Sequence, residues 1–243
     1  MSLLSRFKSL LPPGSEAAHP PSIHATSSCK RWNHPEFQIC VSSAAIPAQD
    51  IAWFLDFLEQ RVAAGERFRS GESLQVGWMY TTIQDGPDGM LRVQEPDMKT
   101  VPIKFVDSLD NTLKHVRAQR DIAASLTPAV SPEFPSLRQS AVVHVNYRTA
   151  ECLLLSRFES DEMNSGWWIS DLEDPSGSED PTRFSKTSLY QLGVDRPDLI
   201  KFFALPTGLQ VAIDKTGIGV LDHEGEVAQV PGSFLGELNR IRG

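Results

Sequence analysis

Hydrophobic and polar residues in the first half of the chain follow two periods, which predict helices and strands. Hydrophobic residues recur at helical spacing between Pro47 and Gly65, so we expect an amphipathic helix bounded by these two residues. Residues 74–80 alternate between hydrophobic and polar and predict a strand. The same patterns predict further strands at 37–42, 90–94 and 101–106 and a second helix at 107–125.

Shorter hydrophobic runs in the second half predict a second set of strands and helices. We expect strands at 141–147, 151–158 and 167–170, a short helix at 196–205, a hairpin at 209–221 and a closing helix at 233–241. This mixture predicts an α+β protein with two domains, each a largely antiparallel sheet with packed helices. Proline-rich stretches divide the chain into an N-terminal arm (1–30), a first α+β domain (31–127), a linker (128–136) and a second α+β domain (137–243).

The composition is that of a folded protein without membrane segments. Of its 243 residues, 40% are hydrophobic and 22% charged, which is enough for two modest cores. No apolar run approaches the ~20 residues that a bilayer span requires, so we expect no membrane partner. The first eleven residues lack the cleavage site of a signal peptide. The three widely spaced cysteines favour a reducing, cytoplasmic location over a disulfide framework.

The net charge of −8 is concentrated in one segment. Between Glu159 and Asp180 the chain has eight acidic residues and no Lys or Arg, whereas 23 acidic and 23 basic residues balance elsewhere. Such a segment repels nucleic acid, and it speeds association with a basic protein surface. We therefore expect a protein partner with a basic surface and no nucleic-acid partner.

Two adjacent tryptophans lie within this acidic segment. Neighbouring side chains on a strand point to opposite faces, so one indole enters the core while the other faces away. The outward indole lies either exposed beside the acidic residues or under a covering helix. Tryptophan is enriched in interface hot spots, which makes Trp168 a candidate anchor. The candidate partner-binding residues are Glu159, Asp161, Glu162, Trp168, Asp171, Glu173, Asp174, Glu179 and Asp180.

Motifs of the common enzyme classes are missing from the sequence. It has no nucleophile elbow, zincin motif, Walker A loop or kinase signature, so we expect neither catalysis nor a cofactor. Two metal alternatives remain open: zinc on the His and Cys residues between 19 and 40, and calcium on the acidic segment 171–180. The alternative functions are a metal-assisted hydrolase that uses the acidic loop and an adaptor that binds a peptide at a strand edge.

One series of short motifs resembles a family of small bacterial toxin-immunity proteins. The series comprises a Ser-Gly-Trp strand at 165–169, the acidic loop, a short helix and a Leu-Pro-x-Gly turn at 205–208. Residues 71–78, 95–98 and 117–121 are similar to the domain that often precedes the immunity domain. The resemblance implies a two-domain immunity protein of a type VI secretion effector. Such a protein is expected to bind a cognate nuclease toxin in the cytosol and inhibit it stoichiometrically.

Overall fold

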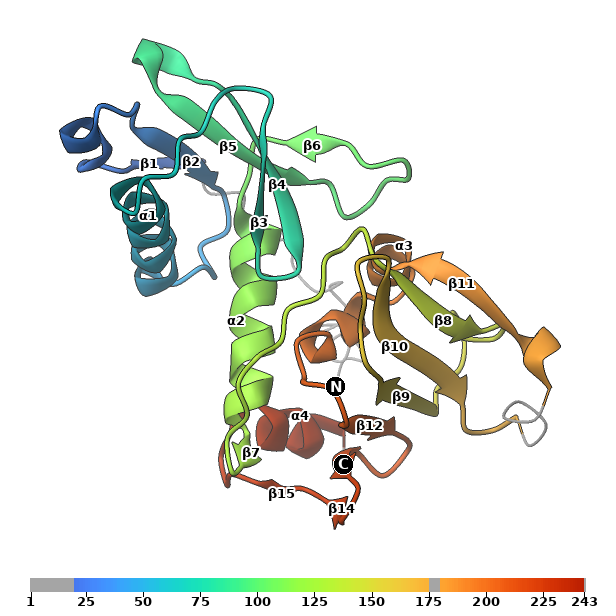
Figure 1. The fold of residues 1–243 in the computed structure, drawn as a ribbon. Helices are drawn as coiled ribbons and strands as arrows, with labels where there is room; N and C mark the ends of the chain where they lie inside the picture. The colour runs from blue at the N-terminus through green and yellow to red at the C-terminus, as the bar shows by residue number, and fades with distance from the viewer. Residues whose placement is uncertain (1–19, 175–179, 243) are drawn as a thin grey trace, which may run out of the picture.

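The structure, a computed structural model, describes residues 20–174 and 180–242. Within these residues the chain has the predicted α+β fold, with two main sheets that are mostly antiparallel (Figure 1). The first nineteen residues of the predicted N-terminal arm and the candidate residue Glu179 lie outside the described residues.

The first sheet is built from the N-terminal half of the chain. Its strands follow the order β1 (Ser22–Ala25), β2 (Phe37–Val41), β5 (Leu91–Pro96), β4 (Met79–Asp85) and β3 (Ser73–Val76), and β6 (Phe105–Val106) also pairs with β5. β2 and β5 are parallel, and the other pairs are antiparallel. Strand β1 lies in the stretch that composition assigns to the arm. Three of the four residues of β1 are exposed, so its sequence shows no alternation of buried and exposed positions. The strand is held by backbone pairing with β2.

Helix α1 (Ala48–Ala63) packs on this sheet and confirms the predicted amphipathic helix. Its buried residues Ile51, Phe54, Leu58 and Val62 share a core with side chains of β2, β3 and β5. Two short 3₁₀ turns, η1 (Cys29–Trp32) and η2 (Pro87–Gly89), complete this half.

The second sheet is built from the C-terminal half. Its strands follow the order β11 (Phe184–Ser188), β8 (Ser140–His144), β10 (Asn164–Asp171), β9 (Leu153–Arg157), β12 (Gln210–Ile213), β13 (Ile218–Asp222) and β14 (Gly225–Glu226). Only the β8–β10 pair is parallel. The helical elements of this half are η3 (Pro181–Arg183), α3 (Leu189–Asp195), η4 (Pro197–Phe202) and α4 (Phe234–Arg242). The buried side chains of η4 pack against the buried residues of the sheet.

Helix α2 (Asp110–Ala124) lies between the two sheets and contributes to both cores (Figure 1). Leu113 and Val116 belong to the first core, whereas Ile122 belongs to the second. The Gln119 side chain donates a 3.0 Å hydrogen bond to the Ile200 carbonyl in η4. After α2, β7 (Leu126–Thr127) pairs with β15 (Ala228–Gln229) from the end of the chain. The domain boundary at 128–136 stays a prediction. Helix α2, which ends before this stretch, contributes side chains to the cores of both halves.

Candidate partner-binding site

The Ser-Gly-Trp motif forms a bulge at the start of β10. Asn164 pairs with Ser140 and Trp168 with Val142, so four steps along β10 match two along β8. Gly166 has a φ of +79°, and a Cβ at this position would lie 2.9 Å from the Glu159 carbonyl and closer still to that of Phe158. A side chain does not fit there, and the left-handed conformation is unfavourable for any other residue. The glycine of this motif, Gly166, is therefore required by the backbone geometry.

Trp167 fixes this bulge to the core. Its indole is buried and donates a 3.0 Å hydrogen bond from Nε1 to the Phe203 carbonyl. The guanidinium of Arg157 lies over the ring, 5.4 Å from its centroid. Arg157 is only 3% exposed, and its Nε and Nη1 have no hydrogen-bond partner among the described residues. Burial lowers the pKa of Arg157 to about 10, against an opposing effect of the Glu133 carboxylate.

Trp168 lies on the opposite face of β10, as the strand alternation predicts. Its ring is half-buried and contacts Phe184 of β11, with ring centroids 4.8 Å apart. Phe184, from the strand beyond β8, therefore covers part of the indole. A contact between Trp168 and a partner remains a prediction.

The candidate acidic residues fall into two clusters at opposite ends of β10. Glu159, Asp161 and Glu162 lie in the loop before this strand, and Asp171, Glu173, Asp174 and Asp180 lie at its end and beyond. Seven strand residues, 164–170, separate the clusters by about 20 Å. The segment that is continuous in sequence is thus divided in space.

The first cluster, residues 159–163, presents carboxylates to solvent. We call it the 159–163 loop. Asp161 shapes the loop by accepting hydrogen bonds of 2.7 Å from the backbone amides of Met163 and Asn164. These bonds and that from the Asn164 side chain lower the pKa of Asp161. The exposed carboxylates of Glu159 and Glu162 have no ion pair or hydrogen bond within the described chain.

The second cluster is largely paired within the protein. Arg183 donates to Asp174 from both Nε and Nη2, and Lys215 bonds Glu173 at 2.9 Å. The hydrogen bond and charge of Lys215 lower the pKa of Glu173. Asp180 caps η3 by accepting a 2.9 Å hydrogen bond from the Thr182 amide. The carboxylates of this second cluster already accept hydrogen bonds from cations or amides. The 159–163 loop therefore offers a partner more unpaired negative charge than the second cluster does.

Residues considered for metal binding do not come together in the described part of the chain. His144 is buried, with Nε2 3.1 Å from Asp174 Oδ2, and its Nδ1 accepts a hydrogen bond from the Asn146 amide. His34 is also buried, and its ring nitrogens contact the Pro35 carbonyl and the Phe68 amide. No group of three or more His, Cys, Asp or Glu residues within 20–174 and 180–242 is arranged to hold a metal ion.

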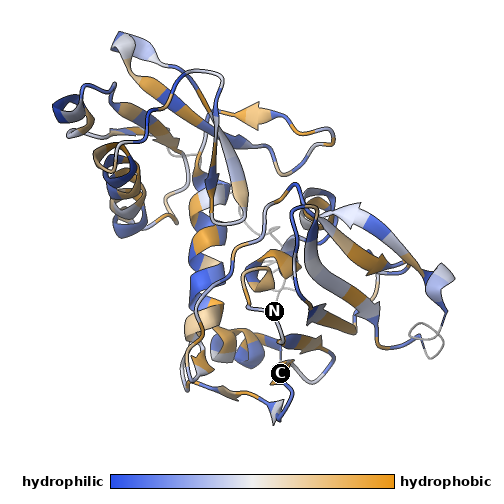
Figure 2. Ribbon diagram, viewed as in Figure 1, coloured by the Kyte–Doolittle hydropathy of each residue, from blue (hydrophilic) through white to orange (hydrophobic). Residues whose placement is uncertain are grey.

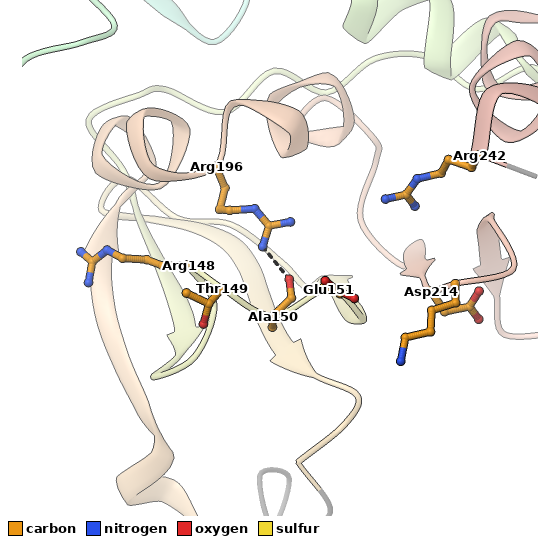
Figure 3. Close-up of a pocket in the computed structure, with 8 residues that line it drawn as sticks. Arg148, Thr149, Ala150, Glu151, Arg196, Asp214 and Arg242 are labelled. Carbon is orange, nitrogen blue, oxygen red and sulfur yellow. Dashed lines mark hydrogen bonds between the residues drawn. The ribbon is translucent and has the colours of Figure 1, made fainter.

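A basic pocket of about 460 Å³ lies beside the second sheet and is not apparent from the sequence (Figure 3). Four of its lining residues are cationic: Arg148, Arg196, Lys215 and Arg242. Most of these charges have structural partners. Arg196 Nη1 donates to the Ala150 carbonyl at 3.0 Å, and Arg148 pairs with Asp195. Its lining comes from distant parts of the chain, so no local sequence signal predicts it.

A larger groove of about 920 Å³ lies beside the N-terminal ends of α1 and α2. Five carboxylates and three cations line it: Asp50, Glu95, Asp97, Asp110 and Asp121, with Lys99, Lys114 and Arg117. The buried Glu95 accepts hydrogen bonds from the Asn111 and Thr112 amides at the start of α2. Burial raises the pKa of Glu95, although these amides oppose the rise. The sequence shows Glu95 in a motif but gives no sign that it caps a distant helix.

Comparison with protein families finds a match over part of the chain. Residues 118–223 match the Imm33-like domain. This part of the chain is similar to a toxin-immunity family. The matched residues cover the end of α2 and the second sheet through β13. They include the series of motifs at 165–208 but not the upstream motifs at 71–78 and 95–98. Comparisons with curated proteins and with solved structures give no match. No helix in the described ranges is long and apolar enough to cross a membrane.

Proposed function

We propose that the chain is an immunity protein that binds a cognate secreted toxin and neutralises it by stoichiometric inhibition. The match of residues 118–223 to the Imm33-like domain carries this proposal. It acts in the cytosol, without catalysis or a cofactor. The free, buried thiols of Cys29, Cys40 and Cys152 are compatible with a reducing compartment.

We propose that the toxin is a nuclease effector of a type VI secretion system. The known immunity protein that we expect this chain to correspond to is TsiT. A nuclease needs a basic groove to hold its nucleic acid. The exposed carboxylates of the 159–163 loop are complementary to such a groove and compete with phosphate for it. The proposed inhibition is therefore occupation of the substrate groove by an acidic loop.

The test is binding of the full chain to the toxin domain encoded beside its gene. Calorimetry at low and moderate salt gives stoichiometry and affinity, and stopped-flow mixing gives the association rate. We expect one-to-one binding that weakens with salt. The double variant Glu159→Lys, Glu162→Lys is expected to associate about tenfold more slowly at low salt, because it reverses two unpaired charges.

The matched control is Glu224→Lys, Glu226→Lys, which makes the same charge change at the β14 edge of the second sheet, three strands beyond β9. A general effect of net charge slows both variants equally. An association rate unchanged in the loop variant rules out steering by the 159–163 loop but leaves inhibition through another surface. Absence of binding by the wild-type chain at both salt concentrations contradicts the immunity function itself.

A further inference from the structure

The hairpin that joins β5 to β6 exposes a run of apolar side chains. We call residues 97–106 the 97–106 hairpin. Val101 is 57% exposed, Ile103 37%, Phe105 40% and Val106 37%. Figure 2 shows β6 and the chain before it as a hydrophobic stretch at the outside of the first sheet. Exposed apolar side chains gathered in so short a segment are typical of a protein interface.

This hairpin is held in place by a tyrosine hydroxyl from the second half of the chain, whose single proton is shared between two carbonyls. The Tyr190 hydroxyl of α3 lies 2.6 Å from the carbonyls of both Asp97 and Thr100. Within the hairpin, the Asp97 amide donates a 2.7 Å bond to the Lys104 carbonyl. Met98 packs against the second core. The exposed side chains therefore stand on an ordered support, which lowers the entropic cost of binding a partner through them.

The same support connects the hairpin to the 159–163 loop. The Gln139 side chain donates a 2.6 Å hydrogen bond to the Asp161 backbone carbonyl, and the Gln139 backbone carbonyl accepts a hydrogen bond from the Leu189 amide. Leu189 adjoins Tyr190, which holds the hairpin. In Figure 1 the hairpin and the upper end of β10 both lie next to α3. Met163, 74% exposed, adds an apolar side chain to the loop.

Charge around these apolar residues defines the kind of partner. The loop offers the unpaired carboxylates of Glu159 and Glu162. On the other side, the hairpin residues Asp97, Lys99 and Val106 also line the groove in which carboxylates outnumber cations. The negative border lies on the side of the 159–163 loop, whereas the hairpin itself carries Lys99 and Lys104 against Asp97. The loop side of the apolar residues fits a partner whose own apolar residues lie beside Lys and Arg.

We propose that the 97–106 hairpin and the 159–163 loop form one docking face for a basic surface of the cognate toxin. The hairpin supplies the apolar anchor, and the loop steers the approach. This inference rests on the proposed function and deepens it, because half of the face lies outside the Imm33-like domain at 118–223. The steering charges act on the association rate, whereas the apolar anchor acts on the dissociation rate.

The test compares two double variants in calorimetry with the same toxin domain. Val101→Ser, Phe105→Ser removes apolar surface from the hairpin, and we expect affinity to fall about 30-fold or more, as for hot-spot residues. The control Val145→Ser, Val230→Ser removes apolar surface of similar exposure elsewhere and is expected to bind as the wild type does. In the wild-type complex, we expect toxin binding to protect the amides of residues 103–108 and 159–163 from hydrogen exchange. This measurement does not depend on the folding of a variant.

Each outcome separates the inference from the proposed function. Wild-type binding with unchanged affinity in the hairpin variant and no protection of residues 103–108 overturns the docking face and leaves the immunity function standing. Failure of the wild type to bind overturns both. A dimer of the free chain that the hairpin variant converts to monomers assigns the hairpin to a second copy of the protein, and this result also overturns the inference.

Discussion

Gly166→Ala tests whether the Ser-Gly-Trp motif is a backbone requirement. The new Cβ would meet the backbone of Phe158 and Glu159, atoms that have no side-chain freedom with which to move away. The strand must then shift and weaken the 2.9 Å hydrogen bond from the Phe158 amide to the Gly166 carbonyl. We therefore expect Gly166→Ala to lower the free energy of unfolding, and the size of this loss reports how closely the backbone surrounds Gly166.

The magnitude follows from three contributions. A non-glycine residue in the left-handed region costs roughly 1–2 kcal/mol. A lost backbone hydrogen bond costs about 1 kcal/mol, and overpacking of a closed site costs about 1–3 kcal/mol. The expected total is about 4 kcal/mol, a large part of the 5–15 kcal/mol that is typical of domain stability. For a chain of this size the melting temperature should fall by about 12 °C.

The matched control is Gly208→Ala. Gly208 also has a positive φ, +92°, but a Cβ there meets nothing within 4 Å. Its expected cost is therefore the conformational contribution alone, about 1.5 kcal/mol. Urea denaturation followed by tryptophan fluorescence and circular dichroism compares the two variants with the wild type. Equal losses in Gly166→Ala and Gly208→Ala would refute the steric argument for the bulge.

Two further predictions concern buried charge in the second half. Asp195 accepts hydrogen bonds from Tyr147, Arg148 and Gln191. Burial alone would raise its pKa, but these bonds outweigh burial and lower the pKa below the ordinary 3.8. Asp195→Asn should therefore cost about 2 kcal/mol at neutral pH. The difference from the wild type should begin to shrink as the pH falls below about 4 and continue to shrink toward the lowered pKa of the folded state, because a depressed carboxyl pKa stabilises fully only above the unfolded-state value. An undiminished difference at pH 3 in a urea titration contradicts this. Arg157→Met should be neutral or slightly stabilising in the same assay, because it removes a buried guanidinium with two unpaired nitrogens and keeps contact with Trp167. A loss above about 2 kcal/mol would show that the cation itself stabilises the core.

Much of the fold could be predicted from local periodicity. Helix α1 shows a strong helical repeat because one face packs on a sheet, and strand β10 shows alternation because Trp167 and Trp168 face opposite sides. Strand β11 and helix α3 were not predicted. β11 is an edge strand with mostly polar, part-exposed residues, so it has little burial pattern. A signal for α3 was present nonetheless: Ser188 and Gln191 have capping-box spacing, and the Ser188 hydroxyl accepts from the Gln191 amide.

The candidate site was predicted by composition but not in its spatial arrangement. The acidic residues between 159 and 180 follow from counting charges, whereas their division into two clusters depends on the length of β10, which the predicted strand 167–170 underestimates. The alternation at 101–106 predicts a strand, of which the structure has only β6, Phe105–Val106. Exposure of those residues depends on which neighbours the fold places beside them, and no local pattern contains that information.

The shared helix α2 limits how the proposed docking face can be dissected. Division of the chain at 128–136 would leave Ile122 of α2 without its partners in the second core, and Trp78 without its contact to Phe203, where the ring centroids are 5.4 Å apart. It would also remove Tyr190 from the hairpin that it holds. Loss of toxin binding by an isolated half would therefore reflect lost folding as much as a lost contact. Point variants on exposed side chains of the intact chain avoid this ambiguity, because they change the surface while both cores and their common helix stay in place.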